Sequence, residues 1–255
     1  MIKEDLHIGL LQLDSLWNDP MGNVSLIDNH LSLLSVTPDL LVLPEMWSTG
    51  FVMNPKRSAV SLHHPAINAL QEVAAKYDVA ILGSQAVADG IDYYNRVLLS
   101  LPDSTKAIYD KQYLFAPAGE GVAYTAGEGI NDFSFAGWNI RPQVCYDLRF
   151  PEGVRNGGQP DLIIYMANWP SARIYHWDQL LIARAIENQC YVAACNRTGT
   201  DGNGWQFPGH SAVIDHMGNV VKQLGSDHTY GFATLQHSAA KHYREKMPFH
   251  QDKKF

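Results

Sequence analysis

The apolar residues near the amino terminus switch between the two periods that distinguish strands from helices. Residues 6–13 alternate between apolar and polar or small side chains, as expected of a strand. After Asn23, which can cap a helix, apolar residues recur three or four positions apart as far as Leu34. The same helical spacing runs from Ile67 to Tyr77. Both stretches are predicted to be helices, and their alternation with strands indicates an α/β protein.

Short apolar runs bounded by turn residues predict the other strands. These runs lie at residues 40–43, 79–82, 86–88, 96–101, 107–109, 133–135, 138–144, 162–166, 191–195, 211–214, 220–224 and 232–235. A long helix is expected over about Tyr175–Asn188, and the carboxyl-terminal tail (about 237–255) should begin as a helix. Because several neighbouring strands are joined by tight turns, we expect two layered sheets with helices on their outer faces. No repeat or linker interrupts the chain, so one domain over residues 1–255 is predicted.

Composition and charge exclude several kinds of partner. The chain has 255 residues, of which 46% are hydrophobic and 18% charged, enough to bury a substantial core. A net charge of −7 without a basic stripe argues against a nucleic-acid or anionic-membrane partner. The amino terminus is charged where a signal peptide needs an apolar core, and no apolar run approaches the ~20 residues of a membrane span. We therefore expect a cytoplasmic protein.

Cys145 is a candidate nucleophile because it stands where a predicted strand meets a short helical turn. Unpaired backbone N–H groups and the helix dipole at that place are expected to lower the pKa of its thiol from the usual value of about 8.5. A buried, inert thiol is the alternative for any lone cysteine. The chain has only two other cysteines, Cys190 and Cys195, which is too few for a disulfide framework or a zinc knuckle. We interpret both as packing residues.

Glu45 and Lys111 each follow a predicted strand and lie in apolar sequence. In layered α/β folds the carboxyl ends of strands gather on one side, so both side chains could meet Cys145 there. A carboxylate could take the thiol proton, and the lysine with the backbone N–H of Tyr146 could hold the negative charge that develops on a carbonyl oxygen. These groups suffice for acyl transfer. A lone charged residue after a strand is more often solvated, and spacing alone leaves that alternative open.

Three segments, LLVLPEMWSTGF, DKQYLF and RPQVCYDLRFP, resemble in this order the signature segments of the nitrilase, or carbon–nitrogen hydrolase, family. The resemblance covers nearly the whole chain. It implies a four-layer αββα sandwich, with two mixed sheets covered by helices, and a triad of Glu45, Lys111 and Cys145. Glu120 resembles the second glutamate with which many members orient the lysine and the substrate, although a solvated loop carboxylate is the alternative. Tyr113 departs from the pattern, because many relatives have histidine there.

Further segments, among them CYDLRFP, YMANWP, RAIENQCYVAACNR and YREKMP, resemble the bacterial omega-amidase branch. The resemblance implies hydrolysis of the terminal amide of small 2-oxo acids, 2-oxoglutaramate or 2-oxosuccinamate, through a cysteine thioester. It also implies a homodimer or larger homo-oligomer and no metal or organic cofactor, and the tail should pack on the body or on a partner subunit. The alternatives are an amidase for N-carbamoyl amino acids or other aliphatic amides, and a catalytically inactive binding protein.

A dicarboxylate-like substrate requires a cation for its distal carboxylate. Arg173 and Arg149 are the candidates, although Arg149 could equally form a structural ion pair with Asp147 or with a helix end. Other candidate pocket residues are aromatic side chains near strand ends and a histidine near the start of the long helix, and packing explains each of them equally well. They are Trp47, Phe51, Trp169 and His176.

Other enzyme classes lack their motifs in this chain. There is no Gly-x-Ser-x-Gly for a serine hydrolase, and neither Gly-x-Gly-x-x-Gly nor a Walker A loop for a nucleotide-binding enzyme. The eleven histidines lack the His-x-x-x-His spacing of a helical metal site, so no metal ligands are predicted.

Overall fold

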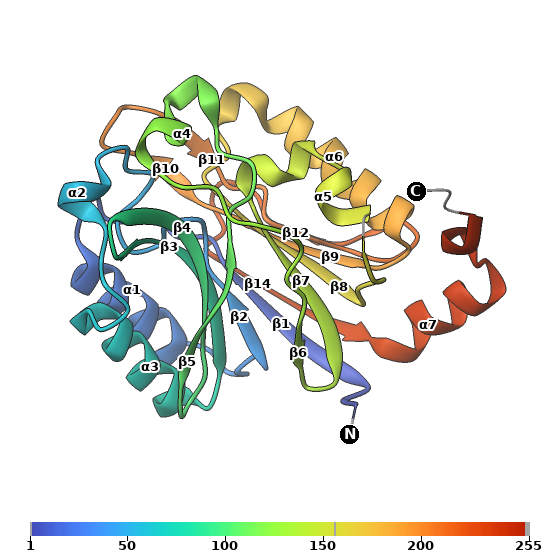
Figure 1. The fold of residues 1–255 in the computed structure, drawn as a ribbon. Coiled ribbons are helices and arrows are strands. Elements are labelled where there is room, and N and C mark those ends of the chain that lie inside the picture. Colours follow the sequence, from blue (N-terminus) through green and yellow to red (C-terminus); the bar gives the residue numbers. More distant parts are fainter. Residues whose placement is uncertain (1, 156, 253–255) are drawn as a thin grey trace.

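The computed structural model describes residues 2–155 and 157–252, and within them two six-stranded mixed sheets face each other (Figure 1). The first sheet has the order β14-β1-β2-β3-β4-β5, and the second has the order β13-β12-β9-β8-β7-β6. The first contains β1 (Asp5–Leu11), β2 (Leu40–Val42), β3 (Ala80–Asp89), β4 (Asp92–Ser100), β5 (Thr105–Asp110) and β14 (Tyr230–Gln236). The second contains β6 (Phe133–Phe135), β7 (Trp138–Val144), β8 (Leu162–Ala167), β9 (Tyr191–Asn196), β12 (Ala212–Ile214) and β13 (Val220–Gln223).

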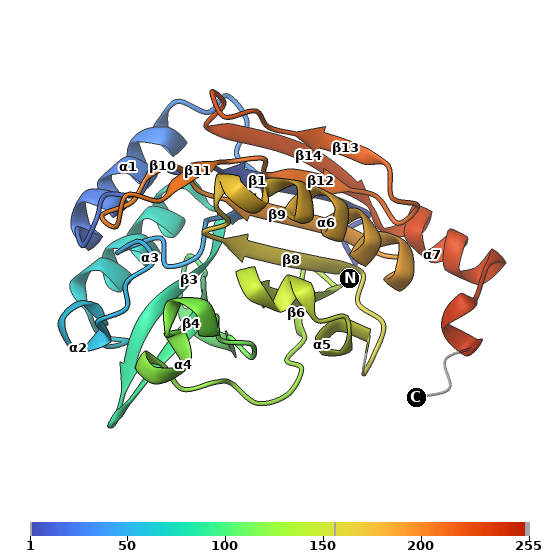
Figure 2. The same ribbon diagram turned by 90° about the horizontal axis from the view of Figure 1, so that it is seen from above.

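Helices cover the outer faces of both sheets, as Figures 1 and 2 show from two directions. Against the first sheet lie α1 (Pro20–Ser32) and α3 (Pro65–Tyr77), and against the second lie α5 (Glu152–Arg155) and α6 (Ile174–Asn188). The remaining helices are α2 (Pro55–Ser58), α4 (Glu120–Ala123) and α7 (His237–Lys246), with short 3-10 turns at Ala116–Ala118, Cys145–Arg149, Ser171–Arg173 and Phe249–Asp252. The expected αββα sandwich is confirmed.

The strands in the middle of each sheet are apolar on both faces because both faces are buried. In β2, Leu40 and Val42 point into the core between the sheets, whereas Leu41 packs under the helices of the first sheet. In β8, Ile164 faces the core between the sheets and Ile163 faces α6. The continuous apolar runs in the sequence thus follow from the position of these strands between two apolar layers.

Local structure differs from the sequence-based expectation at several places, among them these three. Helix α1 begins at Pro20 with Asp19 as its N-cap, so Asn23 lies inside the helix, where its side chain bonds the backbone of Leu16 and Ser48. A proline suits the first helical position because its missing N–H would have no partner there. The two strands expected at 79–82 and 86–88 form one strand, β3. The short ribbon of β10 (Thr198–Thr200) and β11 (Gln206–Pro208) was not predicted.

The carboxyl ends of the central strands lie at one side of the sandwich. Strands β1, β2 and β3 are parallel, as are β7, β8 and β9, and β5 runs in the direction of β3 because it is separated from it by the antiparallel β4. Glu45, Lys111, Cys145 and Asn168 all follow such strand ends. The fold therefore brings residues from distant parts of the chain to one place.

The carboxyl-terminal helix α7 packs beside the second sheet. The backbone N–H of His237 donates to Glu4 of the chain's first turn at 2.9 Å, and Arg244 forms an ion pair with Asp161. Within the described ranges, no helix is both long and apolar enough to cross a bilayer.

Substitution of Ile164 by alanine should destabilise the core between the sheets. The side chain is fully buried, and its loss removes apolar contacts and leaves a cavity, which typically costs about 2–5 kcal/mol in the free energy of unfolding. Urea denaturation measures this change. Ile91→Ala is the matched control because Ile91 is 94% exposed, so it should shift the free energy by less than about 0.5 kcal/mol.

Candidate active site

Four residues that the sequence singled out meet at the carboxyl ends of the strands. Lys111 directly follows β5, Cys145 directly follows β7, Glu45 comes three residues after β2, and Glu120 begins α4. The lysine Nζ lies 2.9 Å from Glu45 Oε1 and 2.8 Å from Glu120 Oε2, and all three charged side chains are fully buried. The solvated alternatives for these residues are therefore wrong.

Two asparagines that the sequence did not suggest as site residues hold the carboxylates in place. The side-chain amide of Asn95, in β4, donates to Glu45 Oε1 at 2.8 Å and to Glu120 at 3.3 Å. The backbone N–H of Asn168 donates to Glu45 Oε2, and its side-chain amide donates to the Glu45 carbonyl oxygen, both at 2.9 Å. Glu45 is thus hydrogen-bonded to β4 of the first sheet and to the residue that follows β8 of the second. The signals for Asn168 were its place after a predicted strand and its position in the YMANWP segment. Nothing in the sequence marked Asn95 as a site residue, because it lies inside a strand.

The thiol of Cys145 lies beside this charge cluster, and its pKa is raised rather than lowered. Burial is the largest cause, and the carboxylate of Glu45 adds to it, while the ammonium of Lys111 acts in the opposite direction. The expectation of a lowered pKa is wrong because the nearby carboxylate and the low polarity outweigh a turn of only five residues. The resting thiol is therefore protonated and needs a base.

The charge of Lys111 is secured by its neighbours. Burial alone would lower the pKa of this ammonium, but Glu120 and Glu45 outweigh burial and hold the pKa well above its ordinary value. Lys111 is therefore a permanent cation next to Cys145. The other two thiols, of Cys190 and Cys195, are fully buried in the apolar cores, which confirms them as packing residues.

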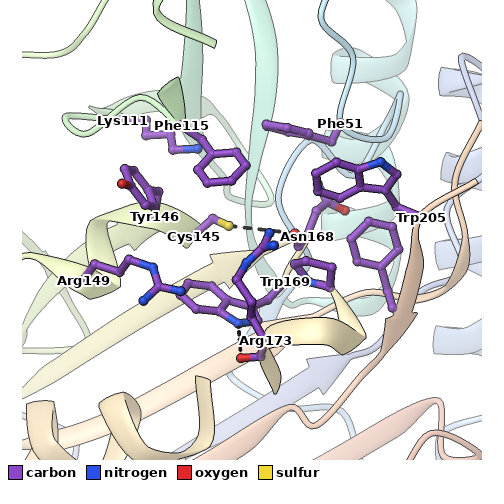
Figure 3. Close-up of a pocket in the computed structure, with 12 residues that line it drawn as sticks. Phe51, Lys111, Phe115, Cys145, Tyr146, Arg149, Asn168, Trp169, Arg173 and Trp205 are labelled. Atoms are coloured by element: carbon purple, nitrogen blue, oxygen red, sulfur yellow. Dashed lines mark hydrogen bonds between the residues drawn. The ribbon is translucent and has the colours of Figure 1, made fainter. Parts of the chain in front are cut away.

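A largely apolar cavity lies beside Cys145 (Figure 3). Phe51, Tyr146, Arg149, Trp169 and Arg173 line it, in agreement with the sequence-based candidates. Three aromatic lining residues were not predicted, and they come from the loop after β5 and from the β10–β11 ribbon: Phe115, Trp205 and Phe207. Because β10 and β11 were not predicted from the sequence, their contribution to the wall of the cavity was not predicted either.

Two other predicted pocket residues lie elsewhere. Trp47 is buried in the core under α1 and α3, where its indole packs on Gly83, so its assignment to the pocket wall was wrong. His176 is exposed and contacts the pocket only through Arg149, with Nδ1 3.2 Å from a guanidinium nitrogen. Tyr113, the departure from the family pattern, stacks on Phe150 with ring centroids 4.0 Å apart and does not line the cavity.

The two arginines at the cavity differ in their partners. Arg149 bonds His176 and lies over the ring of Trp169, so the alternative of an ion pair with Asp147 is wrong. The guanidinium of Arg173 lies 5.5 Å from the ring centre of Phe115 and 5.8 Å from that of Trp205. Across residues 2–155 and 157–252, neither arginine forms an ion pair with a carboxylate, and the guanidinium of Arg173 has no hydrogen-bond partner. The cavity thus presents an unneutralised cation.

No grouping of three or more His, Cys, Asp or Glu side chains with the geometry of a metal site occurs in the part of the chain that the structure describes.

Two facing mixed sheets with outer helices, and a buried Glu–Lys–Cys cluster at the strand ends, define a carbon–nitrogen hydrolase. The family model for carbon-nitrogen hydrolases matches residues 7–245, so the chain belongs to this family and is an amidohydrolase acting on C–N bonds. It is 42% identical over 252 residues to omega-amidase YafV of Yersinia enterocolitica, with 98% of both chains covered. It is 35% identical to the 2-oxoglutaramate amidase of Bacillus subtilis, with 96% of both covered.

A solved structure supports the same assignment. The protein XC1258 of Xanthomonas campestris, described as a CN-hydrolase superfamily protein with an arsenic adduct in its active site, superposes with a TM-score of 0.94. The two chains are 37% identical, and the match covers 99% of this chain and 98% of that one.

Substitution of Lys111 by methionine should destabilise the fold strongly at neutral pH. It leaves two buried carboxylates without their cation, and breaking a buried ion pair in this way typically costs about 3–5 kcal/mol. Urea denaturation at pH 7 measures this effect. Lys76→Met, which breaks an exposed pair with Asp28, is the control and should change stability far less.

Proposed function

We propose that this enzyme hydrolyses the terminal amide of small 2-oxo dicarboxylic acid monoamides, 2-oxoglutaramate and 2-oxosuccinamate, to the acid and ammonia. The observation that carries the proposal is a small cavity with the nucleophile, its base and an ammonium at one end and the unneutralised guanidinium of Arg173 in its wall. The names of the relatives from Yersinia and Bacillus support the same substrate class.

The first half of the proposed reaction forms a thioester. Glu45 takes the proton of Cys145, and the sulfur attacks the amide carbon. Lys111 and the backbone N–H of Tyr146 hold the negative oxygen of the tetrahedral intermediate, and loss of one such donor typically costs ~10²–10³ in rate. Glu45 then gives its proton to the departing nitrogen, so the C–N bond breaks and ammonia leaves.

The second half releases the acid. Water enters the position that ammonia has left, Glu45 removes a proton from it, and the resulting hydroxide attacks the thioester carbon. The same donors hold the oxygen again, the C–S bond breaks, and the thiolate of Cys145 regains its proton from Glu45. The protonated resting thiol described above fits this cycle, since each turnover begins and ends with the proton on sulfur. Glu120 keeps Lys111 in place through two contacts, at 2.8 and 3.0 Å.

Recognition of the far end of the substrate is assigned to Arg173. A guanidinium can bind a carboxylate through two parallel hydrogen bonds, which also fixes the direction of the substrate. The rings of Phe115 and Trp205 flank Arg173 without using its N–H groups. Arg149 is less suited because His176 already occupies one of its nitrogens.

A panel of amides tests the activity and the nucleophile together. Ammonia release should be fastest on 2-oxoglutaramate and 2-oxosuccinamate and slower on glutamine and N-carbamoyl-β-alanine, and Cys145→Ala should reduce it at least ~10³-fold. Cys190→Ala is the matched control, because its thiol lies in the core away from the cavity. A preference for N-carbamoyl-β-alanine would contradict the substrate assignment. Inactivity of folded protein on every amide would favour a binding role.

Replacement of Arg173 by methionine tests the carboxylate site. Loss of a charge-assisted hydrogen bond costs about 1.5–3 kcal/mol, which corresponds to a rise of roughly 10- to 100-fold in KM for 2-oxoglutaramate. Hydrolysis of a neutral aliphatic amide of similar length should change little, since it lacks the carboxylate. Arg149→Met provides the comparison. A larger rise in KM for Arg149→Met than for Arg173→Met would contradict the assignment of the carboxylate site to Arg173. An equal loss of activity of Arg173→Met on both amides would contradict it too.

A further inference from the structure

Asp147 is a fully buried carboxylate, two residues after the nucleophile, that the proposed reaction does not use. Its Oδ2 accepts from the backbone N–H of Val144 at 2.8 Å and from the hydroxyl of Tyr109 at 2.9 Å. Its Oδ1 accepts from the backbone N–H of Tyr113 at 2.9 Å. Among the residues that the structure describes, no cation forms an ion pair with this carboxylate. A buried carboxylate with three donors and no such partner is costly, so its position requires an explanation.

The first of these bonds closes the turn that carries the nucleophile. Cys145 has a φ of 46°, in the left-handed region that residues other than glycine rarely adopt. Such a conformation persists only where the surrounding structure holds it. The bond from Val144 N–H to Asp147 ties the residue before Cys145 to the second residue after it. The carboxylate therefore holds the strained backbone that points the sulfur into the cavity.

The other two bonds reach the first sheet, on both sides of Lys111. Tyr109 is the last buried residue of β5, and Tyr113 lies two residues beyond the lysine. The hydroxyl of Tyr109 also accepts from the backbone N–H of Gln112 at 3.1 Å, so the whole loop around Lys111 is tied to one carboxylate. Asp147 thus joins the segment that carries the nucleophile to the segment that carries the ammonium.

We propose that Asp147 is a positioning residue, whose ionised carboxylate fixes the sulfur of Cys145 relative to the ammonium of Lys111. The importance of that distance rests on the proposed function, in which both groups act on one carbonyl. All three bonds are donated to the carboxylate, which has lone pairs for each. Protonation removes the negative charge that strengthens all three bonds, so the bonds weaken and the turn loosens.

Protonation of Asp147 falls within an accessible pH range. Burial raises its pKa to about 6, although the ammonium of Lys111 and the three hydrogen bonds act to lower it. The titratable groups that face it are Tyr109 and Lys111 from the β5 side, Tyr113 from the following loop, and Tyr165 from β8. Since the ionised form is the ordered one, positioning should be complete well above pH 6, half lost at about pH 6 and lost further as the pH falls.

Alkylation of Cys145 by iodoacetamide, followed by mass spectrometry of its peptide, tests this without any substrate. For a thiol with a raised pKa, the logarithm of the rate should rise with pH with a slope of one. The ionisation of Asp147, which positions the sulfur, should increase this slope to two below pH 6. The pH profile should therefore show a break, a change of slope from two to one, near pH 6. Tyr109→Phe removes a donor to the charged carboxylate, so the break should move upward by about 1 pH unit. Tyr77→Phe, whose hydroxyl bonds Asp28 in a remote helix, is the matched control and should leave the break in place.

Asp147→Asn is the second variant, because it keeps the shape and turns one acceptor into a donor. It should show no break, and its alkylation rate at pH 7.5 should fall by about 10²-fold, as expected for a misplaced reacting atom. Thermal unfolding well above the assay temperature establishes that each variant is folded. A break that is absent from the wild-type protein, or unmoved in Tyr109→Phe, would overturn the proposal. If these shifts occur but no amide is hydrolysed, the positioning role stands and the proposed function fails.

Discussion

The structure depends on a mutual requirement among buried charges. Lys111 could not remain charged in the interior without Glu45 and Glu120, and two carboxylates so close together could not remain charged without the lysine. Each of them follows a different strand or begins a short helix, so the electrostatic requirement fixes the relative position of three segments. Asn168 extends this constraint to the second sheet through its two bonds to Glu45. The same buried ion pairs therefore determine both the geometry of the site and the packing of the segments around it.

The two sheets contribute different chemistry to the same cavity. The first supplies the carboxylates and the ammonium, and the second supplies the sulfur and the Asn168 backbone. The core between them is apolar. Near the cavity, Asp147 and Asn168 are polar links across the junction, and both act largely through backbone N–H groups. Such links hold atoms to within tenths of an ångström because the donors belong to rigid strands and their immediate ends.

Sequence reasoning predicted what depends on local period and on strand ends, and it missed what depends on tertiary contacts. The convergence of Glu45, Lys111 and Cys145 was predictable because parallel strands place their carboxyl ends together. The role of Asn95 was not, since an asparagine within a strand looks the same whether it faces solvent or two carboxylates. Trp47 was misassigned because its direction is set by the space above Gly83, a contact 36 residues away in the chain. The sign of the thiol's pKa shift likewise depends on burial, which only the assembled sandwich provides.

The pairing of β1 with β14 has a consequence for biosynthesis. These strands lie at opposite ends of the chain, yet they pair in antiparallel register over seven residues each, from Asp5–Gln236 to Leu11–Tyr230. A ribosome releases β1 first and β14 almost last. The edge of β1 that pairs with β14 therefore stays unpaired while more than two hundred residues are made. Exposed strand edges are sites of aggregation, and pairings of such long range form slowly. The nascent protein thus passes most of its synthesis with the edge of β1 open. Strand β14 is itself the outermost strand of the first sheet, so its arrival covers β1 and moves the open edge to a strand that is made almost last.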